Sequence, residues 1–156
     1  MHPKQFALIG GALMLILGVV AFVPAFNTAP ADAGLPLLNL ETSYGLFLNA
    51  IPMNVINKIV LIAFGITGIW AANRPLTNLP ASINWSRWVF AVMGVGTILG
   101  LFYQTNTVGG YWPLFGGDVA LHAVGAIFGA YFGFVLPARA AKELSQRFPD
   151  SQRRAS

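Results

Sequence analysis

Four long apolar segments constrain the fold of this chain more than any other feature. They lie at about residues 5–26, 53–72, 86–104 and 118–137. An α-helix needs roughly 20 apolar residues to cross the hydrocarbon core of a bilayer. Only 9% of the residues are charged, whereas soluble domains contain about a quarter, so a water-soluble fold is excluded. The sequence predicts an all-α membrane protein in which residues 1–156 form one domain with four transmembrane helices in two hairpins.

The segments between these helices are rich in residues that end helices. Proline, asparagine, threonine and glycine recur in residues 27–52, 73–84 and 104–117. Pro137 is expected to end the fourth helix. Barrel strands would alternate polar and apolar residues, which these segments do not. A signal peptide is an alternative for the first segment, because Lys4 precedes it and Ala31–Ala33 offers small residues for cleavage. Its apolar run is longer than a typical signal core.

The charged residues divide between the two sides of the predicted membrane. The first and third connections contain no Lys or Arg. The N-terminal end, the second connection and the C-terminal segment contain Lys4, Arg74, Arg87, Arg139, Lys142, Arg147, Arg153 and Arg154. Because cytoplasmic loops are enriched in Lys and Arg, both termini are expected in the cytoplasm. The net charge of +4 is therefore interpreted as membrane flanks and not as nucleic-acid binding.

Aromatic residues at the predicted interfaces agree with this orientation. Trp and Tyr are enriched at both membrane surfaces. The predicted inner belt is Trp70, Trp85 and Trp88, and the outer belt is Tyr44, Tyr103, Tyr111 and Trp112. The basic tail, residues 138–156, has Leu144 and Phe148 at helical spacing. It is expected either to extend the fourth helix briefly onto the anionic inner surface or to be an ordinary positively charged tail.

Polar residues inside the apolar segments are the candidate functional residues, because an ionisable group in a bilayer is costly. They form two pairs four residues apart near the outer helix ends, Asn54 with Lys58 and Asp118 with His122. The matching positions suggest either chance or the duplication of one ancestral hairpin. Lys58 could extend to the headgroups or pair with Asp118 on the parallel fourth helix. Asp118 could also cap its own helix.

His122 has three interpretations. It could be a structural residue bonded to Asp118, an axial ligand of a tetrapyrrole such as haem or chlorophyll, or a group in proton or quinone chemistry. Gly125 and Gly129 would leave room beside it for a macrocycle. The other histidine, His2, lies near the opposite membrane face, so two histidines cannot ligate one haem. The metal-site prediction is none, and the cofactor is either absent or a tetrapyrrole at His122.

Glycines predict where the helices pack. In lipid the hydrophobic effect does not drive helices together, so helices pack closely where small residues let their backbones approach. Gly125, Gly129 and Gly133 recur every four residues and share a stripe with Asp118 and His122. The third helix offers Gly96 and Gly100. These glycines are expected to pack within the four-helix bundle, or else to form a groove for another subunit's helix or a flat cofactor.

The sequence lacks the usual signatures of an enzyme. There is no cysteine, and no phosphate-binding loop, nucleophile-elbow pattern or paired-carboxylate site. The leading hypothesis is a non-catalytic accessory or scaffolding subunit of a larger membrane complex, with the bilayer and other subunits or a second copy as partners. The alternatives are a tetrapyrrole-binding subunit of a photosynthetic or respiratory complex, and a small transporter or redox module that uses Asp118, His122 and Lys58.

Short motifs in the middle of the chain point to a family. They are Gly45-Leu-Phe, Asn57–Gly65 with Gly68, Arg87, Leu114-Phe-Gly-Gly-Asp118, and Leu121-His122 with Gly125. Between residues 45 and 133 the chain resembles a bacterial family of small four-helix membrane proteins of unassigned function, and more distantly the DoxX-like proteins.

This resemblance carries expectations of its own. An Asn/Asp…Leu-His pattern typical of the family matches Asp118, Leu121 and His122, whereas the histidines typical of its second helix correspond to Asn57 and Leu61. The resemblance implies four helices and a bacterial cytoplasmic or thylakoid-type membrane, and it implies no activity.

Overall fold

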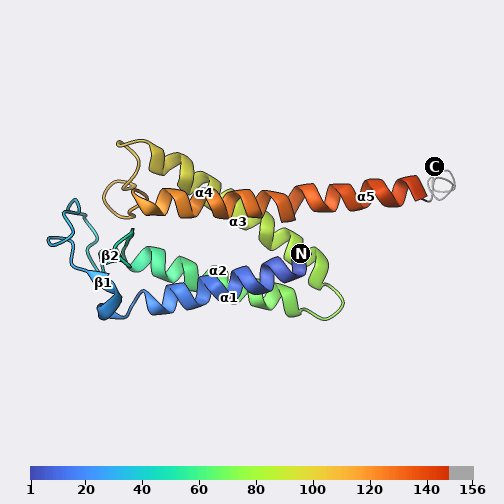
Figure 1. Ribbon diagram of the computed structural model, residues 1–156, viewed down its shortest axis with the longest axis horizontal. Helices are drawn as coiled ribbons and strands as arrows, with labels where there is room; N and C mark the ends of the chain where they lie inside the picture. The colour runs from blue at the N-terminus through green and yellow to red at the C-terminus, as the bar shows by residue number, and fades with distance from the viewer. Residues whose placement is uncertain (148–156) are drawn as a thin grey trace.

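The computed structural model describes residues 1–147, which form four long helices arranged as two hairpins (Figure 1). The first hairpin consists of α1 (Pro3–Val20) and α2 (Val55–Asn73). The second consists of α3 (Asn78–Leu101) and a continuous helix made of α4 (Gly117–Ala130), the π-helical turn η2 (Tyr131–Val135) and α5 (Leu136–Arg147). The predicted all-helical architecture of the spans is therefore confirmed.

Three helices of the described chain are long and apolar enough to cross a membrane: α1, α2 and the continuous helix Gly117–Arg147. The chain is thus a membrane protein with three candidate spans. α3 has 24 residues but is less apolar, because its first turns contain Asn78, Ser82, Asn84 and Arg87. It begins eight residues before the predicted start at residue 86. Pro80 is tolerated there because its position is within the first turn, where a backbone N–H has no partner inside the helix.

The expectation that Pro137 ends the fourth helix is wrong. The helix passes through Pro137 and continues to Arg147. A proline in a helix removes the N–H that would bond the carbonyl oxygen four residues earlier. That oxygen belongs to Gly133, and it accepts a hydrogen bond from Arg87 Nε at 3.0 Å. The π-helical turn directly before Leu136 provides the local adjustment that accommodates a helix-breaking residue.

Aromatic and small residues form the contact between the two hairpins near the N terminus. The main core cluster contains Phe6, Ala7, Ala71, Ala72, Trp85, Val89 and Phe132. The rings of Phe6 and Phe132 stack with centroids 4.6 Å apart. The indole N–H of Trp85 donates to the carbonyl of Phe64 at 3.1 Å. Trp85 is therefore a core residue that joins α2 to α3, and its prediction as an interface residue is wrong.

At the opposite end of the bundle, residues 21–54 and 102–116 form a structure that we call the cap (Figure 1). It contains the short 3-10 helix η1 (Pro24–Phe26) and the strands β1 (Asn27–Thr28), β2 (Gly45–Phe47) and β3 (Ile51–Met53). The strands pair antiparallel in the order β1-β2-β3, with Asn27 opposite Phe47. The third connection joins the first where Asn39 N donates to Gly110 O at 2.8 Å. The sequence interpretation did not include this sheet.

Candidate functional site

Lys58 does not pair with Asp118, contrary to one of the expectations from the sequence. Its Nζ donates to both the carbonyl oxygen and the hydroxyl oxygen of Ser43, each at 2.8 Å. It also lies 5.3 Å from the centre of the Phe22 ring. Only 1% of Lys58 is exposed, so it does not extend to solvent. Because Ser43 belongs to the cap, Lys58 ties the first turns of α2 to the first connection.

Ser43 is an exposed residue of the cap, and its neighbour Tyr44 is buried. Ser43 has a positive φ of 54°, a conformation that costs a non-glycine residue about 1 kcal/mol or more. The Tyr44 hydroxyl donates to Pro36 O at 3.1 Å. Burial, followed by the nearby Glu41 carboxylate, raises the pKa of Tyr44 to about 12. Tyr44 is thus a buried residue of the cap, and its prediction as a residue of the outer aromatic belt is wrong.

Asn54 links α2 to both connections of the cap. Its side-chain oxygen accepts from Ile56 N at 3.0 Å, so Asn54 caps the helix. Its Nδ2 donates to Leu40 O at 3.2 Å and to Tyr111 O at 2.7 Å. Asn57 completes a reciprocal arrangement, because its side-chain oxygen accepts from Asn54 N at 3.1 Å. Asn54 is therefore satisfied by structural bonds.

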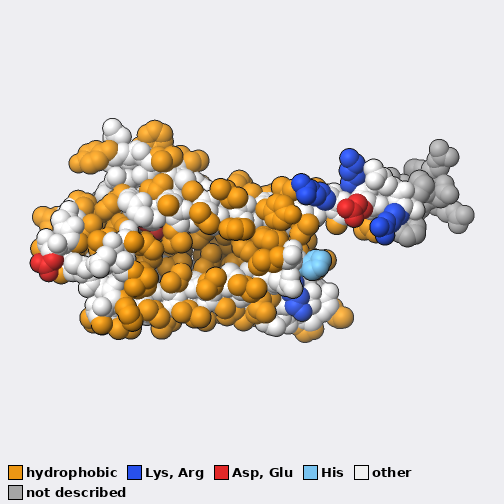
Figure 2. Space-filling model, viewed as in Figure 1, with side chains coloured by type: hydrophobic (Ala, Val, Ile, Leu, Met, Phe, Trp, Pro, Cys, Tyr) orange, Lys and Arg blue, Asp and Glu red, His pale blue; other side chains and the backbone are white. Residues whose placement is uncertain are grey.

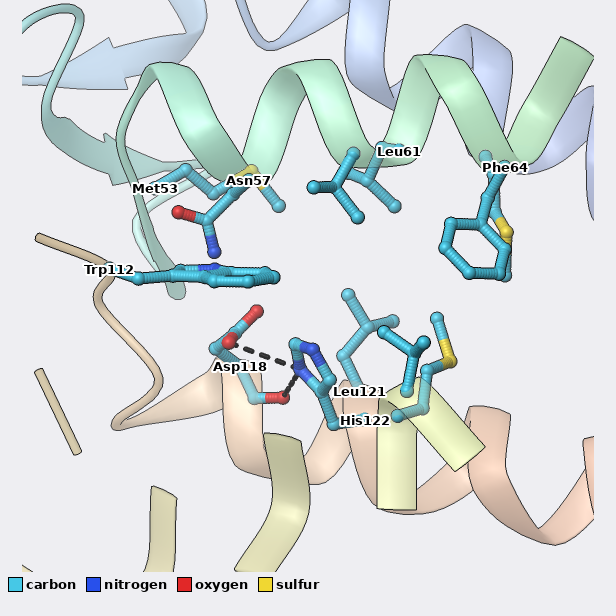
Figure 3. A pocket seen from close by; sticks show the side chains of 12 residues that line it. Met53, Asn57, Leu61, Phe64, Trp112, Asp118, Leu121 and His122 are labelled. Carbon is cyan, nitrogen blue, oxygen red and sulfur yellow. Dashed lines mark hydrogen bonds and ion pairs between the residues drawn. The ribbon is translucent and has the colours of Figure 1, made fainter. Parts of the chain in front are cut away.

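Asp118 and His122 are adjacent, as their spacing on one helix face predicts. Nδ1 of His122 lies 2.9 Å from the carbonyl oxygen of Asp118 and 3.1 Å from its Oδ2 (Figure 3). Both neighbours are hydrogen-bond acceptors when the carboxyl group is ionised, so Nδ1 is the donor, and in the neutral form of the imidazole Nε2 carries the lone pair. Asp118 is 1% exposed. This pair is the most deeply buried ionisable pair in the described chain.

A cavity of about 30 Å³ lies next to this pair, between α2 and α4. Figure 3 shows its polar end, where the Trp112 indole lies between Asn57 of α2 and Asp118 of α4. The remaining wall is apolar and includes Leu61, Phe64 and Leu121. A volume of this size has room for one or two water molecules. The structure therefore brings together Asn57, Trp112, Asp118 and His122 at one site, while Lys58 and Asn54 lie outside it.

The predicted glycine stripe packs against α3. A Cβ atom on Gly129 would lie 2.6 Å from Phe90 N, and one on Gly133 would lie 2.9 Å from the Arg87 side chain. The space beside Gly125 is filled by the Met93 sulfur. From the other side, a Cβ on Gly96 would lie 2.5 Å from Cδ2 of His122, and Gly100 contacts the backbone of Leu114 and the side chain of Val119.

This packing does not fit a tetrapyrrole on His122. A macrocycle needs an open plane around the ligating nitrogen. A Cβ on Gly96 would lie 2.9 Å from Nε2 of His122, so α3 closely covers the nitrogen that bears the lone pair. Gly125 and Gly129 hold α3 close instead of leaving space for a cofactor. Within residues 1–147 there is also no group of three His, Cys, Asp or Glu side chains that could hold a metal ion.

Some residues of the site were not singled out from the sequence. Trp112 was interpreted as an interface residue, yet its Nε1 is buried at the cavity. Three of the four methionines, Met14, Met53 and Met93, also line the cavity, each from a different element. No local pattern predicts this convergence, because α1, β3, α3 and the third connection meet only in the folded chain.

The apolar helices and the buried acid–imidazole pair define this chain as a small membrane protein of the multi-pass class. A family model described as "Domain of unknown function (DUF4383)" matches residues 4–135, and the chain belongs to this family. The matched region includes nearly all of α1 and the whole of α2, α3, α4 and η2. No curated protein and no solved structure matches this chain.

Proposed function

We propose that α3 is a fourth membrane span and that both termini face the cytoplasm. Lys4, Arg74 and the basic residues of α5 lie at one end of the molecule, and the cap at the other end contains no Lys or Arg. On the face shown in Figure 2, the blue side chains gather towards the end with the N terminus and α5. This charge distribution supports the orientation because cytoplasmic segments are enriched in Lys and Arg.

The absence of native cysteine allows a direct test of this topology. Ala31→Cys in the cap and Thr77→Cys between α2 and α3 are matched exposed positions. In intact spheroplasts, a membrane-impermeant maleimide should label Ala31→Cys at once and Thr77→Cys only after lysis. The reverse pattern would place the termini outside, and equal labelling of both variants would contradict a fixed orientation.

The proposed biological role is that of a non-catalytic accessory subunit of a larger membrane complex. The observation that carries this proposal is α5, which leaves the bundle and has no buried residue (Figure 1). It presents Arg139, Lys142, Arg147 and the apolar Leu144, which is 59% exposed. Most helical stability in proteins comes from the packing of an apolar face, and α5 buries no residue. Docking on a membrane partner would cover Leu144 and give the projecting helix a role.

Photo-crosslinking tests this role at residue level. A benzophenone amino acid at Leu144 should give discrete protein adducts in native membranes. The same group at Leu13, which is 56% exposed on the apolar surface of α1, serves as the lipid-facing control. Mass spectrometry of the Leu144 adducts distinguishes another subunit from a second copy of the chain. Lipid adducts alone at Leu144 would contradict an accessory role and favour the membrane-surface helix.

The family resemblance supports a bacterial cytoplasmic membrane as the location and a distant relation to the DoxX-like proteins. Of the two alternative functions, neither is carried forward. The tetrapyrrole does not fit the packing around His122, and Lys58 is bonded to Ser43 and not to the Asp118–His122 pair. The segment 148–156, which includes Phe148, Arg153 and Arg154 of the predicted tail, lies outside the described residues.

A further inference from the structure

Two buried polar atoms of cavity-lining residues form no hydrogen bond within residues 1–147, although one of them lies 3.1 Å from His122 Nδ1. They are Nε1 of Trp112, which is a donor, and Oδ2 of Asp118, which is an acceptor. His122 Nδ1 is near Oδ2, but it also has the Asp118 carbonyl at the shorter distance of 2.9 Å. An unpartnered buried polar group is costly, and native structures contain few of them. One donor and one acceptor at the same cavity therefore indicate an occupant that forms both bonds.

The chemistry of these two atoms restricts the occupant. A metal cation would meet the positive end of the Trp112 N–H, and a carboxylate or phosphate would meet the negative Asp118 oxygen. A hydroxyl group satisfies both, because it donates one hydrogen bond and accepts others. Asn57 does not compete for it, since its oxygen accepts from Asn54 N and its Nδ2 donates to Pro113 O at 3.2 Å.

The apolar wall of the cavity can adapt to a larger molecule. Met14 from α1, Met53 from β3 and Met93 from α3 all contribute to it. Methionine is unbranched and flexible, and it is common at surfaces that accommodate varied apolar ligands. The cavity as it stands has room only for water. A larger molecule would therefore have to displace these flexible side chains.

A second, apolar groove lies beside the cavity. It lies along α3, has a volume of about 390 Å³, and is lined by residues that include Trp88, Val95 and Leu99. Val92, Trp112 and His122 line both this groove and the cavity. Trp88 is 60% exposed and Val95 57%, on a helix face that would meet lipid. The groove and the cavity are therefore neighbours that share three side chains.

We propose that this site binds the hydroxyl head of an apolar membrane molecule, an alcohol or a phenol. The hydroxyl group donates to Oδ2 of Asp118 and accepts from Nε1 of Trp112. The apolar part of the ligand packs on the methionines of the cavity or along the α3 groove. This inference is independent of the accessory role, because it concerns the bundle and not α5.

Indole N–H resonances provide the test. The full chain has four tryptophans, so 15N-labelled protein in phosphatidylcholine nanodiscs should give four indole signals, with Trp112 assigned by its loss in Trp112→Phe. Titration with 4-octylphenol should shift the Trp112 signal to saturation, whereas octylbenzene, which lacks only the hydroxyl group, should not. No shift with octylphenol would leave water as the occupant and overturn the proposal. Equal shifts with both compounds would also overturn it.

Matched variants show whether Asp118 is the acceptor. Asp118→Asn should weaken octylphenol binding about tenfold or more, because it removes a charge-assisted bond. Asp32→Asn, an exposed residue in the cap, should bind as the natural chain does. The three other indole signals report whether Asp118→Asn is folded. If Asp118→Asn does not fold, Trp112→Phe is used in its place. Saturation-transfer signals of octylphenol should then show several-fold weaker binding to Trp112→Phe than to the natural chain. Unchanged affinity in the folded variant would refute the assignment.

Discussion

Replacing Gly129 by alanine tests whether close backbone approach holds α3 against α4. A Cβ atom at this position would lie 2.6 Å from Phe90 N and 2.8 Å from Ser86 O, both backbone atoms that cannot rotate away. Ordinary contact begins at 3.4 Å, so the helices must separate by about 0.8 Å (3.4 minus 2.6). Overpacking of this kind typically costs about 1–3 kcal/mol.

Gly94→Ala is the matched control on the same hairpin. A Cβ atom on Gly94 would meet nothing within 4 Å, so this variant keeps only the gain in helix propensity, about 1 kcal/mol. Both variants receive that gain, and the difference between them isolates the helix contact. Unfolding in mixed micelles with increasing SDS should therefore place Gly129→Ala about 1–3 kcal/mol below Gly94→Ala. Equal unfolding free energies would refute the role assigned to the glycine stripe.

Three further predictions concern hydrogen bonds of the bundle and the cap. Arg87→Met should lower the free energy of unfolding by about 1–2 kcal/mol, because the Gly133 carbonyl loses its hydrogen bond. The loss should be smaller in a Pro137→Ala background, where the new backbone N–H can bond that carbonyl. Equal losses in both backgrounds would disprove the idea that Arg87 replaces the missing N–H of Pro137. Asn54→Ala should lower the free energy of unfolding by about 1–2 kcal/mol, because it removes the helix cap and leaves the carbonyls of Leu40 and Tyr111 without their donor. Replacing the exposed Asn73 by alanine should lower it less in the same assay. Phenolate absorbance should show one tyrosine, lost in Tyr44→Phe, that titrates near pH 12. Since unfolded tyrosine ionises near pH 10, the free energy of unfolding should fall as the pH rises above about 10.

The helical spans and the Asp118–His122 contact were predictable from the sequence, since both depend on local information. Apolar run length decides whether a segment can cross a bilayer. Spacing of four residues places two side chains on one helix face. The glycine stripe could likewise be read from its period, although the sequence alone could not say that Met93 fills the space beside Gly125.

The incorrect predictions concern residues whose hydrogen-bond partner lies in a distant segment of the chain. Pro137 ends a helix by local rules, yet Arg87 of another helix bonds the freed carbonyl. Trp85 and Tyr44 match an interface belt by composition, but each finds a buried acceptor, Phe64 O and Pro36 O respectively. Their final environment is decided by tertiary contacts that no window of the sequence contains.

By itself, the sequence determined that this chain is a membrane protein, that helices form around its four apolar segments, and that His122 contacts Asp118 on the same helix. Only the tertiary structure decided that Lys58 binds Ser43, that Trp112 lines a cavity, and that a buried donor and a buried acceptor without hydrogen bonds belong to residues that line it. The physical reason is that hydropathy and helical period act over a few turns. The occupancy of a cavity depends on side chains brought together from α1, α2, α3, α4 and the cap.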